Sequence, residues 1–243
     1  MIAYEHVVAA TFVRRPNRFI AHVMLEGREV VAHVKNTGRC KELLVPNARV
    51  YLSVAPPQSV RKTAYDLIAV EKVLPSGQKI LINMDANLPN ALVEAYLSLQ
   101  VGKDPHIILR REVVHGDSRF DLCLTDTRNG HKTFIEVKGV TLEHNGVASF
   151  PDAPTQRGIK HLRGLADCVK EGHGAWVFFV IQMKGVHLFR PNDITHPAFG
   201  DALRYAAEQG VIIKCMDCQV TPEEVSIHED VPVDLTYATD IPS

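Results

Sequence analysis

Two short runs of alternating apolar and polar residues constrain the fold of this chain more than any other feature. Residues 117–124 and residues 133–140 both alternate in this way, which is the pattern of half-buried strands. Asp126, Asn129 and Gly130 interrupt the pattern, and turn residues between two such runs predict an antiparallel hairpin. Because successive side chains of a strand point to opposite faces, the hairpin fixes which residues share a face.

The second strand of this hairpin places an acid and an amine side by side. Glu136 and Lys138 share one face, between the aliphatic residues Ile135 and Val137, and Asp121 on the first strand can point into the same space. Two converging carboxylates repel each other unless a cation lies between them, and such oxygen ligands suit Mg²⁺ or Mn²⁺. A lysine beside them can orient a metal-bound water or offset charge on a phosphate. Asp121, Glu136 and Lys138 are therefore candidate catalytic residues of a metal-dependent nuclease, and a solvated strand face is the alternative.

The first third of the chain predicts strands only. Turn residues separate six short runs, and this spacing indicates a small barrel or sandwich, with a five-stranded barrel of the OB type fitting the size. Such barrels bind single-stranded nucleic acid along a basic groove. The strands are expected near residues 6–14, 19–26, 29–35, 48–54, 63–74 and 79–82.

Charge is distributed unevenly although the net charge is only −1. Residues 1–83 hold 12 Lys and Arg against 6 Asp and Glu, whereas residues 84–243 hold 15 against 22. A basic first module favours contact with phosphates, and a solvated basic turn is the alternative. The candidate nucleic-acid-binding residues of this module are Arg14, Arg15, Arg18, Lys35, Asn36, Thr37 and Arg39.

The remainder of the chain mixes helices with strands, which predicts an α/β sheet. A helix expected at residues 87–97 carries Glu94, a candidate further metal ligand. A second helix, within residues 150–172, has Gln156, Arg157 and Lys160 in its first turns, where a helix N-terminus favours phosphate. Strands are expected at residues 107–114, 174–183, 185–191 and 211–220, and a third helix at 198–210. The stretch from Met216 onward has acids but no Lys or Arg, and we interpret it as a solvated terminal segment.

Other patterns limit the compartment and the chemistry. Five cysteines in apolar surroundings favour reduced thiols in a cytoplasmic protein, and the single pair Cys215-x-x-Cys218 is weak support for structural zinc. No basic stretch precedes the apolar N-terminal patch, and no apolar run approaches the roughly 20 residues of a membrane helix. Phosphate-loop and dinucleotide-binding glycine motifs do not occur.

Taken together, these residues resemble the sugar fermentation stimulation protein A family. The resemblance spans nearly the whole chain, and its motifs are Arg18-Phe19, Asn36-Thr37-Gly38, 118-SRFDLCL-124, 135-IEVKGVTL-142 and 150-FPDAPTQRGIKHL-162. It implies a mixed α/β protein with an OB-like domain at residues 1–83 and a PD-(D/E)xK nuclease-like domain at residues 84–243. Members are described as binding DNA and are regarded as DNA/RNA nucleases.

Carried over by motif, the resemblance makes Asp121, Glu136 and Lys138 the catalytic set and adds Glu94 and Gln156. Many members have Ser-Met after Asn-Thr-Gly, where this chain has Arg39-Cys40, so the resemblance does not define the fine contacts of that loop. The family name also links its members to sugar utilisation. A non-catalytic DNA-binding regulator of sugar (maltose) metabolism is therefore the alternative, with an RNA-binding adaptor as a third. The sequence leaves open both a monomer and a homodimer.

Overall fold

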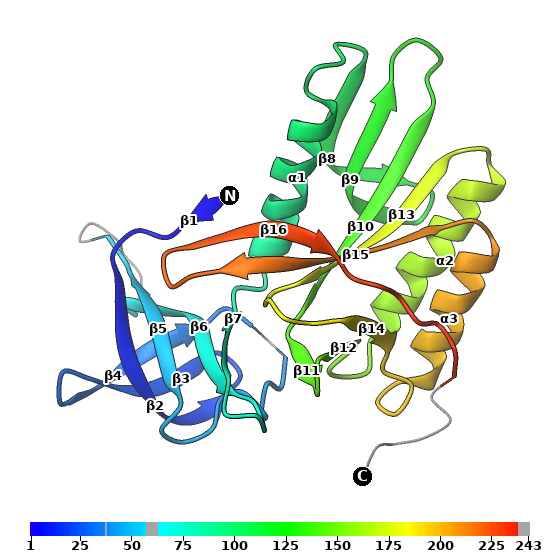
Figure 1. Ribbon diagram of the computed structural model, residues 1–243. Helices are drawn as coiled ribbons and strands as arrows, with labels where there is room; N and C mark the ends of the chain where they lie inside the picture. The colour runs from blue at the N-terminus through cyan, green and yellow to red at the C-terminus, as the bar shows by residue number, and fades with distance from the viewer. Residues whose placement is uncertain (37, 57–62, 238–243) are drawn as a thin grey trace.

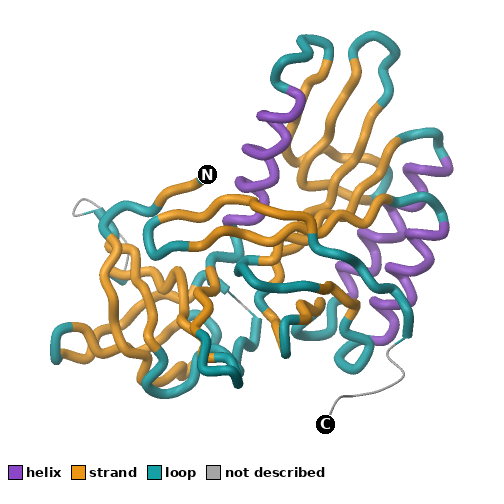
Figure 2. Tube along the Cα trace, viewed as in Figure 1, coloured by secondary structure: helices purple, strands orange, loops and turns teal. Residues whose placement is uncertain are grey.

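The computed structural model describes residues 1–36, 38–56 and 63–237, which form a β-barrel joined to an α/β domain (Figure 1). Among these described residues, helices occur only in the second domain, and the first is built from strands and loops (Figure 2). The strand-only and mixed patterns of the sequence thus correspond to two spatially distinct parts.

The barrel closes through one parallel pairing. Its strands follow the order β4-β3-β2-β5-β6-β7, and the additional pairing of β4 with β6 closes β2 to β6 into a five-stranded barrel. Val23, Val50, Leu52 and Leu67 are fully buried inside it, so the alternating positions of these strands fill the interior. This confirms the OB-like barrel expected from the sequence. The strands are β2 (Val7–Asn17), β3 (Ile20–Leu25), β4 (Arg28–Val34), β5 (Arg49–Val54), β6 (Tyr65–Val73) and β7 (Lys79–Asn83).

The second domain is built on a seven-stranded sheet of order β1-β16-β15-β13-β10-β9-β8. Strands β10, β13 and β15 run parallel, and the others pair antiparallel. The sheet strands are β1 (Ile2–Ala3), β8 (Ile107–His115), β9 (Ser118–Asp126), β10 (Lys132–Val140), β13 (Gly174–Ile181), β15 (Ile212–Val220) and β16 (Glu224–Asp230). A small separate sheet contains β11 (Leu142–His144), β12 (Val147–Phe150) and β14 (Leu188–Pro191).

Three helices cover the two faces of the large sheet (Figure 1). Helix α1 (Leu88–Val101) packs on one face, while α2 (Gln156–Lys170) and α3 (Pro197–Glu208) pack together on the other. Gly164 lets α2 approach β9 closely, because a Cβ there would lie 2.7 Å from the Ser118 hydroxyl oxygen. None of the helices among the described residues is long and apolar enough to cross a membrane.

The interpretation of the acidic C-terminal stretch as a solvated segment is wrong, because residues 224–230 form strand β16. Composition emphasises the acids, but Val225 and Ile227 pack against the apolar cluster beneath α1. Residues 2–3 also depart from the predicted division of the chain, since β1 pairs with β16 instead of the barrel.

A buried amide network joins the barrel to the sheet. The Asn83 backbone N–H donates to the Gln182 carbonyl at 2.9 Å, and the Gln182 side-chain amide donates to Asn83 Oδ1 at 2.9 Å and to the Asp85 carbonyl at 3.1 Å. Asn83 in turn donates to the Tyr4 hydroxyl at 2.9 Å. Lys35 of the barrel reaches Asp85 at 3.0 Å. Because Asn83 and Gln182 are almost completely buried, each of these polar groups depends on its partner.

We expect Gln182→Ala to lower the free energy of unfolding by about 1–3 kcal/mol, since it removes the buried amide that donates to Asn83 Oδ1 and to the Asp85 carbonyl. Urea denaturation measures this change. The matched control is Gln219→Ala, an exposed position on β15, which should change stability by less than about 0.5 kcal/mol. If the two substitutions lowered the free energy of unfolding equally, the stabilising role of Gln182 between the barrel and the sheet would be contradicted.

Candidate functional site

Asp121 lies where the pairing of β9 with β10 ends. The ladder ends at the pair of Leu122 with Ile135, and beyond it Asp121 Oδ2 accepts the Val137 backbone N–H at 2.8 Å. Asp121 Oδ1 accepts the side-chain amide of Asn90, on α1, at 2.9 Å. The carboxylate therefore accepts a backbone N–H of β10 in place of a backbone carbonyl of β9, and it links β9, β10 and α1.

The alternation of β9 is interrupted at this same point. Phe120 packs in the apolar cluster on the α2 side, whereas Leu122 packs in the cluster on the α1 side, although residues two apart in a regular strand share a face. This local irregularity brings Asp121 to the boundary between the two faces, which strict alternation did not predict.

Glu136 is a buried carboxylate on the α2 side of β10, with only 2% of its surface exposed. Its Oε1 accepts from both Lys138 Nζ and His161 Nδ1. Its Oε2 is buried and has no hydrogen-bond partner among the described residues. A negatively charged oxygen in this position is a strong acceptor that lacks a donor.

His161 is a site residue that the sequence interpretation did not select. It projects from α2 onto Glu136, and its Nε2 accepts from Arg157 Nε at 3.4 Å. This pattern assigns a ring proton to Nδ1, which donates to the Glu136 carboxylate. The available signal was helical spacing, since His161 follows Gly158 by three residues and precedes Leu165 by four on the buried face of α2.

The two carboxylates have opposite pKa shifts. Burial, and then the charge of Glu136, raise the pKa of Asp121 above its ordinary value. Burial also acts to raise the pKa of Glu136, but the donors His161 and Lys138 outweigh it, so that pKa is lowered. Glu136 therefore remains ionised, while the charge on Asp121 is disfavoured by repulsion from its neighbour.

The other predicted residues of the second domain lie around this centre. Glu94 is four residues after Asn90 on α1, but its carboxylate pairs with Arg111 at 3.3 Å. Gln156 and Lys160 are exposed and line a cleft of about 620 Å³ beside α2. No group of three His, Cys, Asp or Glu ligand atoms that includes Asp121 or Glu136 comes together in the described part of the chain.

Arg15 of the barrel binds backbone carbonyl groups of the protein itself. Its guanidinium donates to the carbonyl oxygens of Arg18, Asn36, Gly38 and Arg39, at 2.7–3.0 Å, and so holds the loop that follows β4. Because these bonds occupy both terminal nitrogens, Arg15 positions the basic loop rather than presenting a free cation.

The remaining barrel candidates fall into two groups. Lys35 is bound to Asp85 and Asp66, at 3.0 and 3.4 Å, and Asn36 Oδ1 accepts the Gly38 N–H at 2.8 Å. Arg14 is exposed and bound to Glu29, at 2.8 Å, whereas the Arg18 guanidinium lies 5.3 Å from the centre of the Phe19 ring. Thr37 lies outside the described residues.

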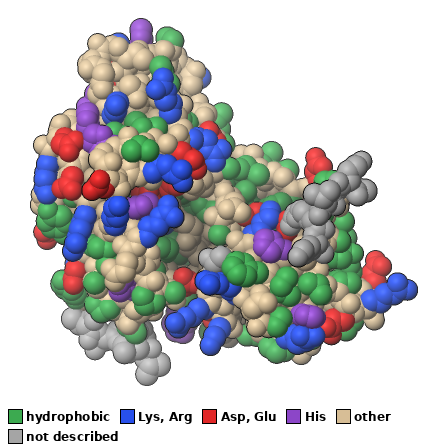
Figure 3. Space-filling view, turned by 180° about the vertical axis from the view of Figure 1, so that it is seen from behind, with side chains coloured by type: hydrophobic (Ala, Val, Ile, Leu, Met, Phe, Trp, Pro, Cys, Tyr) green, Lys and Arg blue, Asp and Glu red, His purple; other side chains and the backbone are tan. Residues whose placement is uncertain are grey.

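A basic pocket of about 640 Å³ opens between β2 and this loop. Its lining contains no acidic side chain among the described residues, and its cationic members are Arg14, Arg15, Arg18, Arg39 and Lys41. The backbone N–H of Arg39 donates to Asp152 of the second domain at 3.1 Å, which ties the pocket to the sheet. From behind, Lys and Arg side chains gather on both sides of the hollow between the two domains (Figure 3).

These features define a two-domain protein in which an OB barrel with a basic pocket precedes an α/β domain with a buried carboxylate–lysine centre. The chain belongs to the sugar fermentation stimulation protein family: the profile of the Sugar fermentation stimulation protein RE domain matches residues 87–224, and that of the SfsA N-terminal OB domain matches residues 13–82.

Relatives and a solved structure agree with this assignment along the whole chain. A sugar fermentation stimulation protein homolog of Clostridium beijerinckii is 49% identical over 95% of this chain and 98% of its own, and one of Desulfitobacterium hafniense is 47% identical over 96% and 98%. The structure of Pyrococcus furiosus SfsA in complex with Ca²⁺ shares the fold, with a TM-score of 0.80, 24% identity, and coverage of 96% of this chain and 98% of that one.

We expect Asp121→Asn to stabilise the metal-free protein at neutral pH. An acid whose pKa is raised on folding destabilises the folded state fully above that pKa, and the penalty disappears as the pH falls below the ordinary value of about 3.9. A gain of about 1 kcal/mol would raise Tm by ~2–4 °C in a chain of this size.

Thermal unfolding at a series of pH values measures this difference, which should shrink toward acid pH. Asp167→Asn is the control, because that carboxylate is exposed and forms an ion pair on the helix surface with Lys170 at 3.2 Å. An Asp121→Asn protein that is less stable than wild type at neutral pH would show that its hydrogen bonds outweigh the repulsion.

Proposed function

We propose that this protein binds DNA, and RNA as a second substrate, and hydrolyses phosphodiester bonds in a reaction that depends on Mg²⁺ or Mn²⁺. The observation that carries the proposal is the unpartnered buried oxygen of Glu136, next to a second carboxylate whose charge it disfavours. Both features disappear when a cation is shared by Asp121 and Glu136, and the donor set is the kind of hard oxygen ligand that these ions prefer.

The residues present fit such an ion. Glu136 Oε2 has a free acceptor direction, and each oxygen of Asp121 accepts one N–H from the described residues, so lone pairs remain for coordination. When bound, the ion supplies Lewis-acid polarisation of the phosphate and lowers the pKa of a water ligand. Glu94 needs to leave Arg111 before it can join the ligands.

Lys138 and His161 have different roles at Oε1 of Glu136. Both donate to Oε1, so His161 still holds the carboxylate if the lysine turns toward a scissile phosphate. Lys138 can then orient the attacking water or offset the negative charge that builds on phosphorus.

The surfaces around this centre favour a nucleic acid as the substrate. The basic pocket of the barrel supplies exposed guanidinium groups, including Arg18 stacked on Phe19, a ring that is 47% exposed. Stacking on aromatic rings and contact with phosphates are how OB barrels hold single strands. Gln156 and Lys160 add donors at the start of α2, the helix that carries His161.

The comparisons add support from a relative. Pyrococcus furiosus SfsA was solved in complex with Ca²⁺, a cation that takes carboxylate ligands. The five thiols of this chain are free and buried, in agreement with action in a reducing cytoplasm, where its substrates occur.

We expect Asp121→Asn and Lys138→Ala each to reduce metal-dependent cleavage about 10²–10³-fold, which is the typical loss for one positioned group. Asp121→Asn should also weaken Mg²⁺ binding, whereas Lys138→Ala should leave it largely intact because a lysine is not a ligand. The measurement is cleavage of labelled single- and double-stranded DNA and RNA with Mg²⁺, Mn²⁺ or EDTA.

Lys103→Ala is the control for these variants, since Lys103 is exposed and distant in sequence from the centre. Nucleic-acid binding should persist in both site variants. If the wild-type protein binds DNA yet cleaves none of these substrates with either ion, the enzyme proposal fails and the non-catalytic regulator becomes the better account.

A second experiment tests the binding surface. The triple variant Arg14→Ala, Arg18→Ala and Arg39→Ala should weaken binding to all sequences alike, and should flatten the dependence of log K on log salt by about one unit per lost phosphate contact. Arg15→Ala should instead destabilise the loop whose carbonyls it binds.

Arg28→Ala removes the same charge from a barrel position outside the pocket and serves as the control. An unchanged salt slope in the triple variant would remove the barrel pocket from the binding surface.

A further inference from the structure

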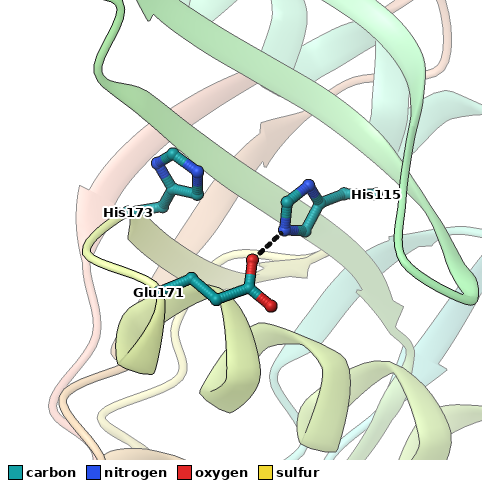
Figure 4. A group of neighbouring side chains, drawn as sticks. All are labelled: His115, Glu171 and His173. Carbon is teal, nitrogen blue, oxygen red and sulfur yellow. Dashed lines mark hydrogen bonds and ion pairs between the residues drawn. The ribbon is translucent and has the colours of Figure 1, made fainter.

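Three side chains that the proposed reaction does not use come together at the far end of the α2 cleft. His115, Glu171 and His173 each offer one ligand atom within 4.8 Å of the others (Figure 4). They are the one such group of His, Cys, Asp or Glu in the part of the chain that the structure describes.

Three separate elements bring this group together. His115 ends β8, Glu171 caps the C-terminus of α2, and His173 immediately precedes β13. Gly172 has φ +86°, a conformation that glycine adopts without strain, and the resulting turn is closed by a 3.0 Å hydrogen bond from the His173 N–H to the Cys168 carbonyl. The turn places Glu171 and His173 on the same side of the helix end, where His115 meets them.

The protein itself satisfies these donors only in part. His115 Nε2 and Glu171 Oε2 are 2.7 Å apart, but His173 Nδ1 is buried and has no hydrogen-bond partner among the described residues. The His173 ring meets His115, Phe134 and His131 edge-on, with centroids 5.5, 5.6 and 6.2 Å apart. In Figure 4 the other ring nitrogen of His173, Nε2, faces His115 and Glu171, so Nε2 is the atom that this ring offers to a metal ion.

We infer that His115, Glu171 and His173 form a site for a divalent transition-metal ion, of which Zn²⁺ fits best. Two imidazoles and one carboxylate are a common ligand set for zinc, whereas Mg²⁺ prefers oxygen ligands. His115 and Glu171 also line the cleft beside α2, so water or a substrate phosphate can reach a fourth coordination position.

This site is distinct from the carboxylate centre and does not rest on the proposed nuclease activity. The His115 ring stacks on Phe134 at 4.5 Å, Phe134 packs on Phe120 at 5.4 Å, and Phe120 in turn meets His161 at 6.4 Å. Two phenylalanine rings thus separate the histidine group from the imidazole that binds Glu136. An ion bound here would join the end of α2 to the β8–β9 turn and stabilise the folded state.

The test is a titration of EDTA-treated full-length protein with Zn²⁺, Co²⁺ and Mg²⁺, followed by calorimetry and, for Co²⁺, by visible absorption. We expect Zn²⁺ to bind in preference to Mg²⁺ and to raise Tm. His115→Ala, Glu171→Gln and His173→Ala should each weaken Zn²⁺ binding by more than about tenfold, the smallest loss typical even for groups that only support a ligand.

Two controls make the outcome specific. His106→Ala removes an exposed imidazole outside the group, and Asp121→Asn removes a ligand of the carboxylate centre, so neither should change the affinity for Zn²⁺. Glu171→Gln retains the shape of the side chain and guards against loss of binding through misfolding. Zn²⁺ binding that is unaffected by the three substitutions, or that depends on Asp121 instead, would overturn the inference whether or not the protein cleaves nucleic acid.

Discussion

The paired amides of Asn83 and Gln182 are the interaction on which the arrangement of the molecule depends. Asn83 ends the last barrel strand and Gln182 follows the central sheet strand β13, so their hydrogen bonds fix one domain on the other. Both are buried, and neither can exchange its partner for water without opening the interface. The basic pocket of the barrel and the carboxylates of the sheet consequently keep a constant separation, which the proposed binding of one nucleic-acid strand across both domains requires.

The two carboxylates of the buried centre, Glu136 and Asp121, have different hydrogen-bond donors. Glu136 receives two donors on one oxygen and none on the other, whereas Asp121 is engaged by N–H groups from α1 and from β10. In this arrangement the repulsion between the two buried carboxylates raises the free energy of the folded state. Burial of charge at this level is tolerated in proteins mainly where the site serves a ligand, and it separates this centre from the many exposed ion pairs on the same surface.

The sequence predicted the barrel, the central hairpin and the buried helix faces, because alternation and helical spacing reflect burial directly. It did not select Asn90 or His161, since their roles depend on which strand each helix crosses. Arg15 illustrates the same limit: a basic cluster suggests free cations, but three of the four carbonyls that bind Arg15 come from the loop after β4, whose path only the tertiary structure defines. Strand β16 was not predicted because acidic residues dominate its composition, although Val225 and Ile227 retain the alternation of a strand.

Strand β1 gives the molecule an unusual connectivity. Because Ile2 and Ala3 pair with β16, the chain begins in the large sheet, leaves it to build the barrel, and returns through β7 and α1. In chain order the barrel is an insertion into the α/β domain, attached by two crossings instead of one. Two attachment points prevent free rotation about a single linker, so we expect the barrel and the sheet to move as one rigid body.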